Sequence, residues 1–498
     1  MSAYIDLQTL ETEGKNQYNE LQQKIAKGLT PKDRTQIPLQ EMPTLEPKQR
    51  AKLMDEVAVG YTTEQAVVEA NRCLQCKNAP CIQGCPVGVP IPQFLEQVSN
   101  GKFKEAVDII KTTNLLPAIC GRVCPQEKQC QLYCTVGKMH KDVEKSVSIG
   151  RLERFVADFE REQKLQNPAD VASPTGKKVA VVGSGPAGLT VAADVRRAGH
   201  DVTVFEAFHK EGGVMVYGIP EFRLPKDIVA NEVNMLKKMG VHFQMNFLVG
   251  RTGTLPQLLQ EQGFDAAFIG TGAGLPKFMG IEGENLIGVF SANEYLTRAN
   301  LMKAYDVEKA ATPLYDAKHI CVVGGGNVAM DAARMALRLG AEQVSVIYRR
   351  TRAEMPARRE EVDHAEEEGV VFRFLENPIK VIGDENGRIT AVQALSYELG
   401  EPDESGRRSP VAITGSEHEV PCDALIIALG NGSNPLMERT TPGLEADKRG
   451  RLKTDENGLT TYANVWAGGD IVLGAATVIL AMGEGRTAAA SINEYLAK

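Results

Sequence analysis

One pattern occurs twice in the chain and limits its fold more than any other feature. Residues 178–188 read Lys-Val-Ala-Val-Val-Gly-Ser-Gly-Pro-Ala-Gly, and residues 319–329 read His-Ile-Cys-Val-Val-Gly-Gly-Gly-Asn-Val-Ala. Each is an apolar run that ends in a glycine-rich turn, followed by a helix-length stretch, a glycine and a second apolar run. The order strand, turn, helix, strand is typical of parallel sheets. The sequence therefore predicts an α/β protein with two sheet domains.

The first turn has the spacing of a dinucleotide-binding turn. Gly183, Gly185 and Gly188 follow a strand and open a helix, where backbone N–H groups can approach a pyrophosphate at the positive helix end. Glu206 ends the next strand, where a carboxylate suits the free ribose hydroxyls of FAD or NAD. A glycine-rich loop without a cofactor is the alternative. The flanking strand and helix favour nucleotide binding and a Rossmann-like domain.

The second turn differs at the position that contacts the ribose. Tyr348 stands where the first unit has Glu206, and two arginines follow it. A carboxylate would repel a 2′-phosphate, whereas guanidinium groups pair with one bidentately. This favours NADP(H) over NAD(H); the alternative is a solvated basic turn. The residues expected to hold this cofactor are Gly324, Gly326, Asn327, Ala329, Arg349 and Arg350.

Eight of the ten cysteines lie between Cys73 and Cys134. They form two groups, Cys-x2-Cys-x4-Cys-x3-Cys-Pro and Cys-x3-Cys-Pro-x4-Cys-x3-Cys. Two sets of four thiolates are the ligand count for two 4Fe–4S clusters. Zinc is the competing metal, but it does no redox work and these cysteines precede two nucleotide domains. Clustering argues against a secreted disulfide scaffold. Cys321 and Cys422, without a cysteine nearby in sequence, are expected to be core residues.

The remaining sequence indicates several domains and excludes some functions. A chain of 498 residues exceeds the size of a single core. Thr62 and Gln65 predict a capping box that starts a helix before the cysteines, and a proline-containing linker follows at 167–176. The stretch 360–368, which contains His364, is expected to be a solvated face. Nothing supports a Ser–His–Asp site.

Charge and hydropathy bear on partners and location. The chain has 56 Lys and Arg against 64 Asp and Glu, a net charge of −8, so no basic excess points to nucleic acid. Its apolar runs are strand-sized, and its N-terminus lacks a basic region followed by an apolar stretch. We expect a cytoplasmic protein with no membrane partner.

The C-terminal region carries a resemblance that assigns the first turn. Residues 461–470 read Thr-Tyr-Ala-Asn-Val-Trp-Ala-Gly-Gly-Asp, and a helix start is expected at 475–479. This resembles the closing FAD motif of the glutathione-reductase-like flavoproteins. The resemblance implies that Asp470 binds the ribityl–phosphate portion and that the following helix N-terminus faces the isoalloxazine. The turns at 269–272 and 428–430 resemble the crossovers of that family, which implies an inserted NADP(H) domain.

A wider resemblance covers the chain from about residue 46 onward. The carrying stretches are 73–86, 117–125, 212–225 and 324–334, which include Ala-Ile-Cys-Gly-Arg and Pro-Glu-Phe-Arg-Leu-Pro. They resemble the family that contains the small (beta) subunit of NADPH-dependent glutamate synthase and the large subunit of the NADH-dependent ferredoxin:NADP oxidoreductase. The N-terminal half of dihydropyrimidine dehydrogenase and a sulfide dehydrogenase subunit are similar too. Residues 1–45 depart from the short form of the family.

The resemblance implies the following site residues. One 4Fe–4S cluster would be held by Cys73, Cys76, Cys81 and Cys134. The other would be held by Cys85, Cys120, Cys124 and Cys130. The FAD residues would be Gly183, Gly185, Gly188, Glu206, Gly213, Gly218, Arg223, Gly272, Gly469, Asp470 and Thr477. Hydride would pass between NADP(H) and FAD, and single electrons would leave through the clusters.

These inferences give a domain layout. We expect an N-terminal extension at 1–45, a helical double-cluster domain at 46–170, an FAD domain in two parts at 171–284 and 436–498, and an NADP(H) domain inserted at 285–435.

They also give two main functions. The first is a subunit of an electron-bifurcating NADH/ferredoxin:NADP transhydrogenase, with ferredoxin and an NAD(H)-binding flavin/2Fe–2S subunit as partners. The second is the NADPH-oxidising small subunit of glutamate synthase, with the glutamine-dependent large subunit as partner. A scaffold that binds nucleotides without turnover is a third alternative.

Overall fold

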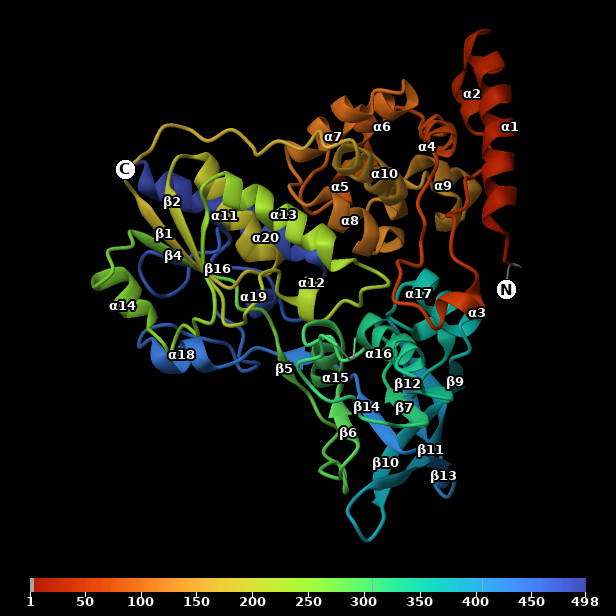
Figure 1. Cartoon of the computed structure of the whole chain (residues 1–498), viewed down its shortest axis with the longest axis vertical. Helices are drawn as coiled ribbons and strands as arrows, with labels where there is room; N and C mark the ends of the chain where they lie inside the picture. The colour runs from red at the N-terminus through yellow and green to blue at the C-terminus, as the bar shows by residue number, and fades with distance from the viewer. Residues whose placement is uncertain (1–3, 307, 405) are drawn as a thin grey trace.

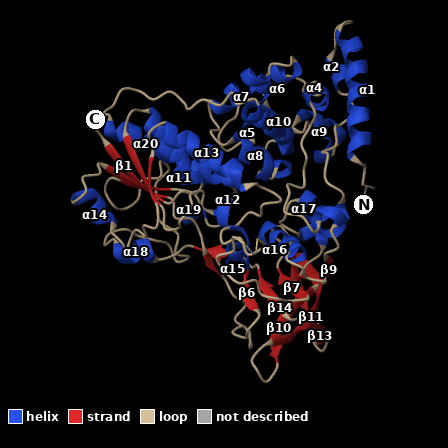
Figure 2. Ribbon diagram, viewed as in Figure 1, coloured by secondary structure: helices blue, strands red, loops and turns tan. Residues whose placement is uncertain are grey.

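The computed structural model describes residues 4–306, 308–404 and 406–498 (Figure 1). It contains a helical N-terminal region, two five-stranded parallel sheets, a four-stranded antiparallel sheet and a short antiparallel pair. Figure 2 shows the strands gathered in two separate places, with the helical region beside them. No helix in the described part of the chain combines the length and apolar character that a membrane span needs. The prediction of an α/β protein with a helical N-terminal part is confirmed.

The N-terminal region consists of short helices packed around a common core. The capping box of α4 is confirmed, because Thr62 accepts from the Gln65 backbone and Gln65 accepts from the Thr62 backbone. Phe103 packs edge-on against Phe155, with ring centroids 5.0 Å apart. The helices are α1 (Leu7–Ile25), α2 (Pro31–Arg34), α3 (Pro47–Arg50), α4 (Thr63–Ala70), α5 (Pro80–Gln83), α6 (Ile91–Ser99), α7 (Phe103–Lys111), α8 (Pro117–Val123), α9 (Thr135–His140) and α10 (Ile149–Glu162). Short 3-10 turns are η1 (Gln126–Lys128), η2 (Gln131–Tyr133) and η3 (Val143–Lys145).

The first sheet has the strand order β16-β4-β1-β2-β3, and all its pairings are parallel. Because strand side chains alternate, Val179 and Val181 face the core of α11, α13 and α20, while Ala180 and Val182 face that of α14, α18 and α19. The strands are β1 (Lys178–Val182), β2 (Asp201–Phe205), β3 (His242–Gln244), β4 (Ala266–Ile269) and β16 (Val465–Ala467). The helices are α11 (Pro186–Arg197), α12 (Val214–Tyr217), α13 (Lys226–Lys238), α14 (Leu255–Gln260), α18 (Leu436–Thr440), α19 (Asp470–Leu473) and α20 (Val478–Leu496).

The second sheet has the order β6-β14-β7-β8-β9 and is also parallel. Helices pack on one face, and a smaller antiparallel sheet packs on the other. The parallel strands are β6 (Val289–Ser291), β7 (His319–Val323), β8 (Gln343–Tyr348), β9 (Val371–Phe374) and β14 (Ala424–Ile427). The helices are α15 (Ala292–Asn300), α16 (Asn327–Arg338) and α17 (Arg359–Glu367), with η4 at Arg352–Glu354. The antiparallel strands are β10 (Glu376–Gly383), β11 (Ile389–Pro402), β12 (Arg408–Ala412) and β13 (His418–Pro421).

The chain passes from the first sheet to the second and back at a short antiparallel pair. Strands β5 (Leu275–Pro276) and β15 (Asn431–Gly432) form this pair, which lies between the two sheets (Figure 1). In sequence, strands β1 to β4 of the first sheet therefore precede the second sheet, and β16 follows it. All five strands of the second sheet lie between β5 and β15 in sequence.

The prediction that residues 360–368 form a solvated face is wrong. Glu361 and Glu368 are buried and bind arginines from distant segments. Arg334 and Arg338 pair with Glu368 at 2.6 and 2.7 Å, and Arg50 pairs with it at 3.1 Å. Although burial raises it, these guanidinium groups bring the pKa of Glu368 well below its ordinary value. The helix is rich in Glu because it balances buried cations.

Cys321 and Cys422 are both buried, as predicted. However, the two thiols are neighbours across the core of the second sheet, which their separation in sequence did not indicate. A hydrogen bond to Cys321, together with burial, raises the pKa of the Cys422 thiol. Both are therefore inert core residues in this structure.

Candidate cofactor sites

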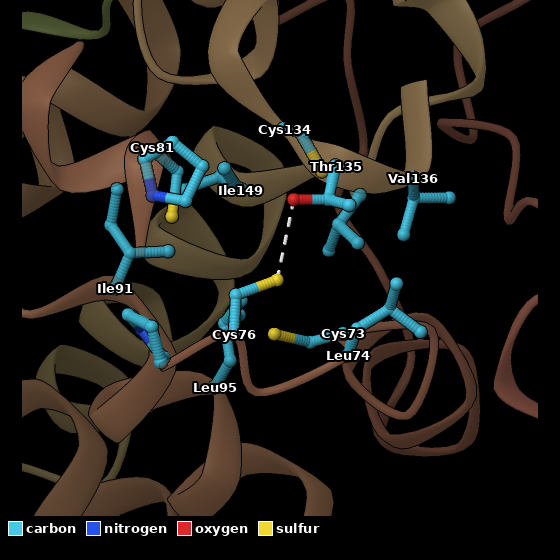
Figure 3. A pocket seen from close by; sticks show the side chains of 13 residues that line it. Cys73, Leu74, Cys76, Cys81, Ile91, Leu95, Cys134, Thr135, Val136 and Ile149 are labelled. Carbon is cyan, nitrogen blue, oxygen red and sulfur yellow. Dashed lines mark hydrogen bonds between the residues drawn. The ribbon is translucent and has the colours of Figure 1, made fainter. Parts of the chain in front are cut away.

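Four cysteines from three separate segments line one cavity in the helical region. Figure 3 shows the side chains of Cys73, Cys76, Cys81 and Cys134 directed toward it. The thiol of Cys76 hydrogen-bonds to the hydroxyl of Thr135 at 3.3 Å. The rest of the wall is apolar and consists of Leu74, Pro80, Ile91, Pro92, Leu95, Val136, Val147 and Ile149, with Thr135 at its edge. This is the first of the two sets that the family resemblance implies.

The other four cysteines lie close to one another, and, as in the first set, two are buried and two are half-buried. Cys120 and Cys124 are buried and hydrogen-bond to each other, and both Cys85 and Cys124 lie near Cys130. Burial raises the pKa of Cys85 to about 11 and that of Cys130 well above its ordinary value. Thiols held neutral in this way ionise when a cationic metal centre supplies the missing charge.

The donor chemistry of these sets fits iron–sulfur clusters. Among the described residues, no group of three or more His, Cys, Asp or Glu side chains has the geometry of a single-ion site. Four sulfurs on one zinc would converge at about 2.3 Å from a common point. In the first set they surround a cavity instead (Figure 3), as the larger iron–sulfur core requires. All-cysteine coordination is also the ligand set of 4Fe–4S clusters.

The first glycine turn has the backbone that a pyrophosphate site needs. Gly183 has φ +100°, and a Cβ there would come within 2.6 Å of the Gly270 carbonyl oxygen. A Cβ on Gly188 would overlap the carbonyl oxygen of Gly183, so helix α11 packs tightly on β1. Beside Gly185, by contrast, the space is open to 4 Å. This open space at the N-terminus of α11 fits the pyrophosphate of a dinucleotide.

Glu206 supports the turn from the end of the neighbouring strand. Its carboxylate accepts from the backbone N–H of Ser184 at 2.9 Å, from the Ser184 hydroxyl at 2.5 Å and from the backbone N–H of Phe208 at 2.9 Å. The Ser184 hydroxyl in turn accepts from the N–H of Gly212 at 3.0 Å. Three donors therefore fix the orientation of the Glu206 carboxylate.

The closing segment of the chain returns to this same turn. A Cβ on Gly469, which has φ +77°, would lie 3.0 Å from Ala187. A Cβ on Gly213 would lie 2.8 Å from the Cα of Gly185. Burial raises the pKa of Asp470 to about 6, and its carboxylate accepts from the N–H of Ala476 at 3.2 Å. The structure thus brings residues from three distant segments around one turn.

The other predicted FAD residues lie near the turn or elsewhere. Thr477 caps α20 by accepting from the N–H of Leu480. Gly272 has φ +70°, at the crossover after β4, and Gly218 ends α12. Arg223 is not directed at the turn. Its guanidinium pairs with Asp331 at 2.7 Å and Glu361 at 3.0 Å, and it thereby ties the 212–225 loop to the second sheet domain.

The second glycine turn has a similar backbone but different neighbouring residues. Gly324 has φ +141°, and Gly325 lies so close to the Tyr348 ring that a Cβ would come within 2.6 Å. Gly326 opens α16, and its Cβ position is free except for Pro356 at 4.0 Å. The side-chain oxygen of Asn327 accepts from the backbone N–H of Arg358 at 2.8 Å. Ala329 is fully buried where the first turn has its last glycine.

The two predicted phosphate-binding arginines are not equivalent. Arg350 is buried; its guanidinium pairs with Asp403 at 2.6 Å and donates to the carbonyl of Arg408 at 2.7 Å. Arg349 is exposed and makes no ion pair with any residue that the structure describes. Arg352, also exposed, pairs with Glu366 at 2.8 Å. Of the three, Arg349 has the free guanidinium.

Contacts between the second cysteine set and the first sheet domain had no signal in the sequence. The Cys120 sulfur lies 3.6 Å from the Met482 sulfur on α20. The side-chain amide of Gln129 donates to the Thr477 hydroxyl at 3.4 Å. A Cβ on Gly483 would lie 3.1 Å from the Pro86 carbonyl oxygen. The first turns of α20 therefore contact the second cysteine set, and Gly485 on the same helix packs against Ala187 of the first glycine turn, where a Cβ would lie 2.7 Å from the Ala187 carbonyl oxygen.

This fold and these donor sets define a class of protein, an NADPH-dependent oxidoreductase that binds FAD and a 4Fe–4S centre. Two family models match the chain. One is described as dihydropyrimidine dehydrogenase domain II, 4Fe-4S cluster, and covers residues 50–165. The other, pyridine nucleotide-disulphide oxidoreductase, covers residues 177–485. The chain belongs to the pyridine nucleotide-disulphide oxidoreductases with this iron–sulfur domain, the family of the glutamate synthase small chains.

Individual relatives agree with that placement. The chain is 39% identical to the glutamate synthase [NADPH] small chain of Halomonas elongata, over 90% of this chain and 94% of that one. It is 39% identical to the NADP(+)-dependent formate dehydrogenase subunit beta of Moorella thermoacetica, over 84% of this chain but only 60% of that one. Among solved structures, Mycobacterium tuberculosis FprA in complex with NADPH matches with a TM-score of 0.54 at 20% identity. The match covers 64% of this chain and 85% of the FprA chain, and it shows only that the two proteins share a fold.

Proposed function

We propose that this protein is the NADPH-oxidising subunit of a larger enzyme and passes electrons through two 4Fe–4S clusters to a partner. The observation that carries the proposal is helix α20. A Cβ on its Gly485 would lie 2.7 Å from the carbonyl oxygen of Ala187 in the first glycine turn, and its Met482 contacts Cys120 of the second cysteine set. A continuous packed route therefore joins the first dinucleotide site to the cysteines.

The residues divide the work along this route. The turn at Gly183, Glu206 and the Asp470 segment would hold FAD, and the turn at Gly324 with Arg349 would hold NADP(H). FAD, when bound, interconverts two-electron hydride chemistry and single-electron transfer. The second cysteine set adjoins α20, and the first lies further out, between α4, α6 and α9. This arrangement supports an order from nicotinamide to flavin, to the second set and then to the first.

The partner that the comparisons support best is a glutamate synthase large subunit. The chain covers 94% of the Halomonas elongata small chain, and it covers 93% of the Escherichia coli small chain at 36% identity. This nearly full coverage of the small chains favours the role of a glutamate synthase small chain. By comparison, the chain spans only 60% of the formate dehydrogenase subunit. In this role the chain would oxidise NADPH and supply electrons to a glutamine-dependent subunit.

The bifurcating transhydrogenase, first choice from the sequence, is the second candidate. Its support is the Ala-Ile-Cys-Gly-Arg and Pro-Glu-Phe-Arg-Leu-Pro stretches within 117–125 and 212–225, which resemble both the ferredoxin:NADP oxidoreductase and the homotetrameric type of glutamate synthase. Mass spectrometry of chains that co-purify with the native protein separates the two candidates. A partner with a glutamine amidotransferase domain supports glutamate synthase, and one with flavin and a 2Fe–2S centre supports the transhydrogenase.

Anaerobic purification followed by iron and acid-labile sulfide analysis tests the shared part of the proposal. Two clusters require about eight iron atoms and eight sulfides per chain. A Cys120→Ala variant should lose about half of the iron, and Cys321→Ala, at a buried cysteine outside both sets, should lose none. NADPH should bleach the flavin absorbance. A wild-type preparation free of iron, or a flavin that stays oxidised with NADPH, would refute the proposal.

A further inference from the structure

A short segment of the second sheet domain, residues 356–358, is held by the second glycine turn. The backbone N–H of Ala357 donates to the carbonyl oxygen of Gly325 at 3.1 Å, and the backbone N–H of Arg358 donates to the side-chain oxygen of Asn327 at 2.8 Å. Helix α16 begins at Asn327, at the end where a dinucleotide pyrophosphate would bind. The backbone that carries Arg358 is therefore fixed to the proposed NADP(H) site.

The side chain of Arg358 reaches the other way, to the second cysteine set. Its guanidinium donates to the carbonyl oxygen of Arg122 at 3.2 Å and to the side-chain oxygen of Gln126 at 3.1 Å. These two residues flank Cys124 in the sequence, and the backbone N–H of Gln126 donates to the Cys124 carbonyl oxygen at 2.9 Å. Arg358 is only 8% exposed. One buried side chain thus joins the two sites.

Arg358 brings a positive charge near the Cys124 sulfur. A hydrogen bond to Cys120 and burial raise the pKa of the Cys124 thiol, whereas the charge of Arg358 acts to lower it. Net charge and hydrogen bonds near an iron–sulfur centre set its reduction potential. Because an added electron makes the centre more negative, a buried cation beside it favours the reduced form.

Two carboxylates lie against Arg358, and neither is fully committed to it. Glu360 pairs with Arg358 at 3.0 Å, but it also pairs with Arg151 at 3.5 Å. Glu127 lies 3.6 Å from the Nε atom of Arg358. That Nε and the Oε1 atom of Glu127 are buried and have no hydrogen-bond partner among the described residues. The guanidinium therefore has a donor to spare, so another anion can attract it without breaking a hydrogen bond.

We propose that Arg358 is a positioning residue that couples NADP(H) binding at the second glycine turn to the reduction potential of the centre in the second cysteine set. The proposal rests on the proposed function, which places these cofactors at the two sites. An anionic dinucleotide and an added electron would both be stabilised by this one cation. Each therefore opposes the other, and the coupling is reciprocal. The bound cofactor lowers the potential of the centre, and the reduced centre favours release of NADP⁺.

The test uses the anaerobic full-length holoenzyme and 2′-phospho-ADP-ribose, a fragment of NADP that lacks the nicotinamide and so accepts no hydride. A redox titration followed by electron paramagnetic resonance measures the potential of the second centre, whose signal is the one that Cys130→Ser abolishes. Arg358→Gln removes the charge, and Arg358→Lys keeps it. The matched control is Arg359→Gln, at a side chain that is 71% exposed and pairs with Glu144 at 3.3 Å.

In the wild type, the fragment should make reduction of the second centre about tenfold less favourable, which lowers its potential by about 59 mV. By reciprocity, calorimetry should show about tenfold weaker binding of the fragment to the reduced protein than to the oxidised protein. Arg358→Gln should lower the potential in the absence of the fragment and lose most of the further shift. Arg358→Lys should restore most of both, and Arg359→Gln should match the wild type.

A wild-type potential that the fragment leaves unchanged overturns the proposal, and this outcome needs no variant to fold. So does a folded Arg358→Gln protein that keeps the full shift, or an Arg359→Gln protein that loses it. An Arg358→Lys protein that behaves like Arg358→Gln overturns the role of the charge. A wild type without iron, or with flavin that NADPH does not bleach, would count against the proposed function instead.

Discussion

The two glycine turns share a backbone and differ in what surrounds it. Each starts at a buried strand with a glycine of positive φ, +100° at Gly183 and +141° at Gly324. Each opens its helix with an extended glycine, Gly185 at ψ −179° and Gly326 at ψ 177°. The shared part is therefore the part that a pyrophosphate meets, and any dinucleotide has a pyrophosphate.

The differences lie where the rest of a dinucleotide would reach. The first turn has the buried Glu206, held by three donors, whereas the second has an aromatic ring and then the exposed Arg349. The first turn also lies under the Asp470 segment, which comes from the far end of the chain. Under the proposed assignment, one backbone would serve two cofactors, and groups outside the turn would decide which cofactor binds.

The largest expected effect concerns the last position of each turn, Gly188 in one and Ala329 in the other. A methyl group on Gly188 would overlap the Gly183 carbonyl oxygen, and backbone cannot move aside as a flexible side chain can. Gly188→Ala should therefore lower the free energy of unfolding by roughly 3 kcal/mol or more. Thermal or denaturant unfolding of the apoprotein measures it.

The matched change in the second turn should be mild. Ala329 is fully buried on α16, so Ala329→Gly removes one methyl and loosens the helix, which costs about 1 kcal/mol. If Gly188→Ala proves as stable as the wild type, the two turns are equally loose and the contrast between them fails.

The second prediction separates cofactor binding from folding. A Cβ on Gly185 meets nothing within 4 Å, and one on Gly326 meets only Pro356 at 4.0 Å. Either glycine can be replaced by alanine without strain, so the new methyl group would clash only with a bound pyrophosphate. Gly185→Ala should weaken FAD roughly 100-fold, or about 2.7 kcal/mol, and leave NADPH binding to the apoprotein unchanged. Gly326→Ala should do the reverse.

Flavin absorbance after gel filtration and calorimetry with NADPH measure the two affinities, and melting temperatures serve as the control. Each variant should melt like the wild-type apoprotein. Retention of full flavin by Gly185→Ala would show that FAD does not lie against this turn.

The sequence predicted the parts of this comparison that are local. Strand, turn and helix follow one another within about a dozen residues, so the periodicity and glycine spacing at 178–188 and 319–329 suffice to predict both units. The Thr62–Gln65 cap is local in the same way, and it formed as predicted. The division of the cysteines into two sets followed from family resemblance, because spacing alone does not tell which of eight thiols share a cavity.

What the sequence did not predict depends on residues far apart in the chain. Glu368 is buried because Arg50 and Arg334 neutralise it, and Arg50 is 318 residues away. The contact of Cys120 with Met482 spans 362 residues. In the sequence, Arg350 and Arg349 are equivalent candidates for binding a phosphate. In the structure, Arg350 instead pairs with Asp403, which lies 53 residues later in a hairpin. In each case a polar or sulfur group has a partner that no local pattern indicates.

The smallest of the three effects tests this last difference between two adjacent arginines. Arg349→Ser removes an exposed guanidinium that is free to bind a 2′-phosphate, so the KM for NADPH should rise about 10- to 30-fold, or about 1.4–2 kcal/mol. The KM for NADH should not change. Arg350→Ser instead breaks a buried pair with Asp403, so it should lower the melting temperature and change the ratio of the two KM values little. Steady-state kinetics with both nucleotides measures the ratio.

Equal loss for NADPH and NADH in Arg349→Ser would mean that this arginine does not distinguish the phosphate. A selective loss of NADPH in Arg350→Ser would mean that the Asp403 pair opens when the cofactor binds.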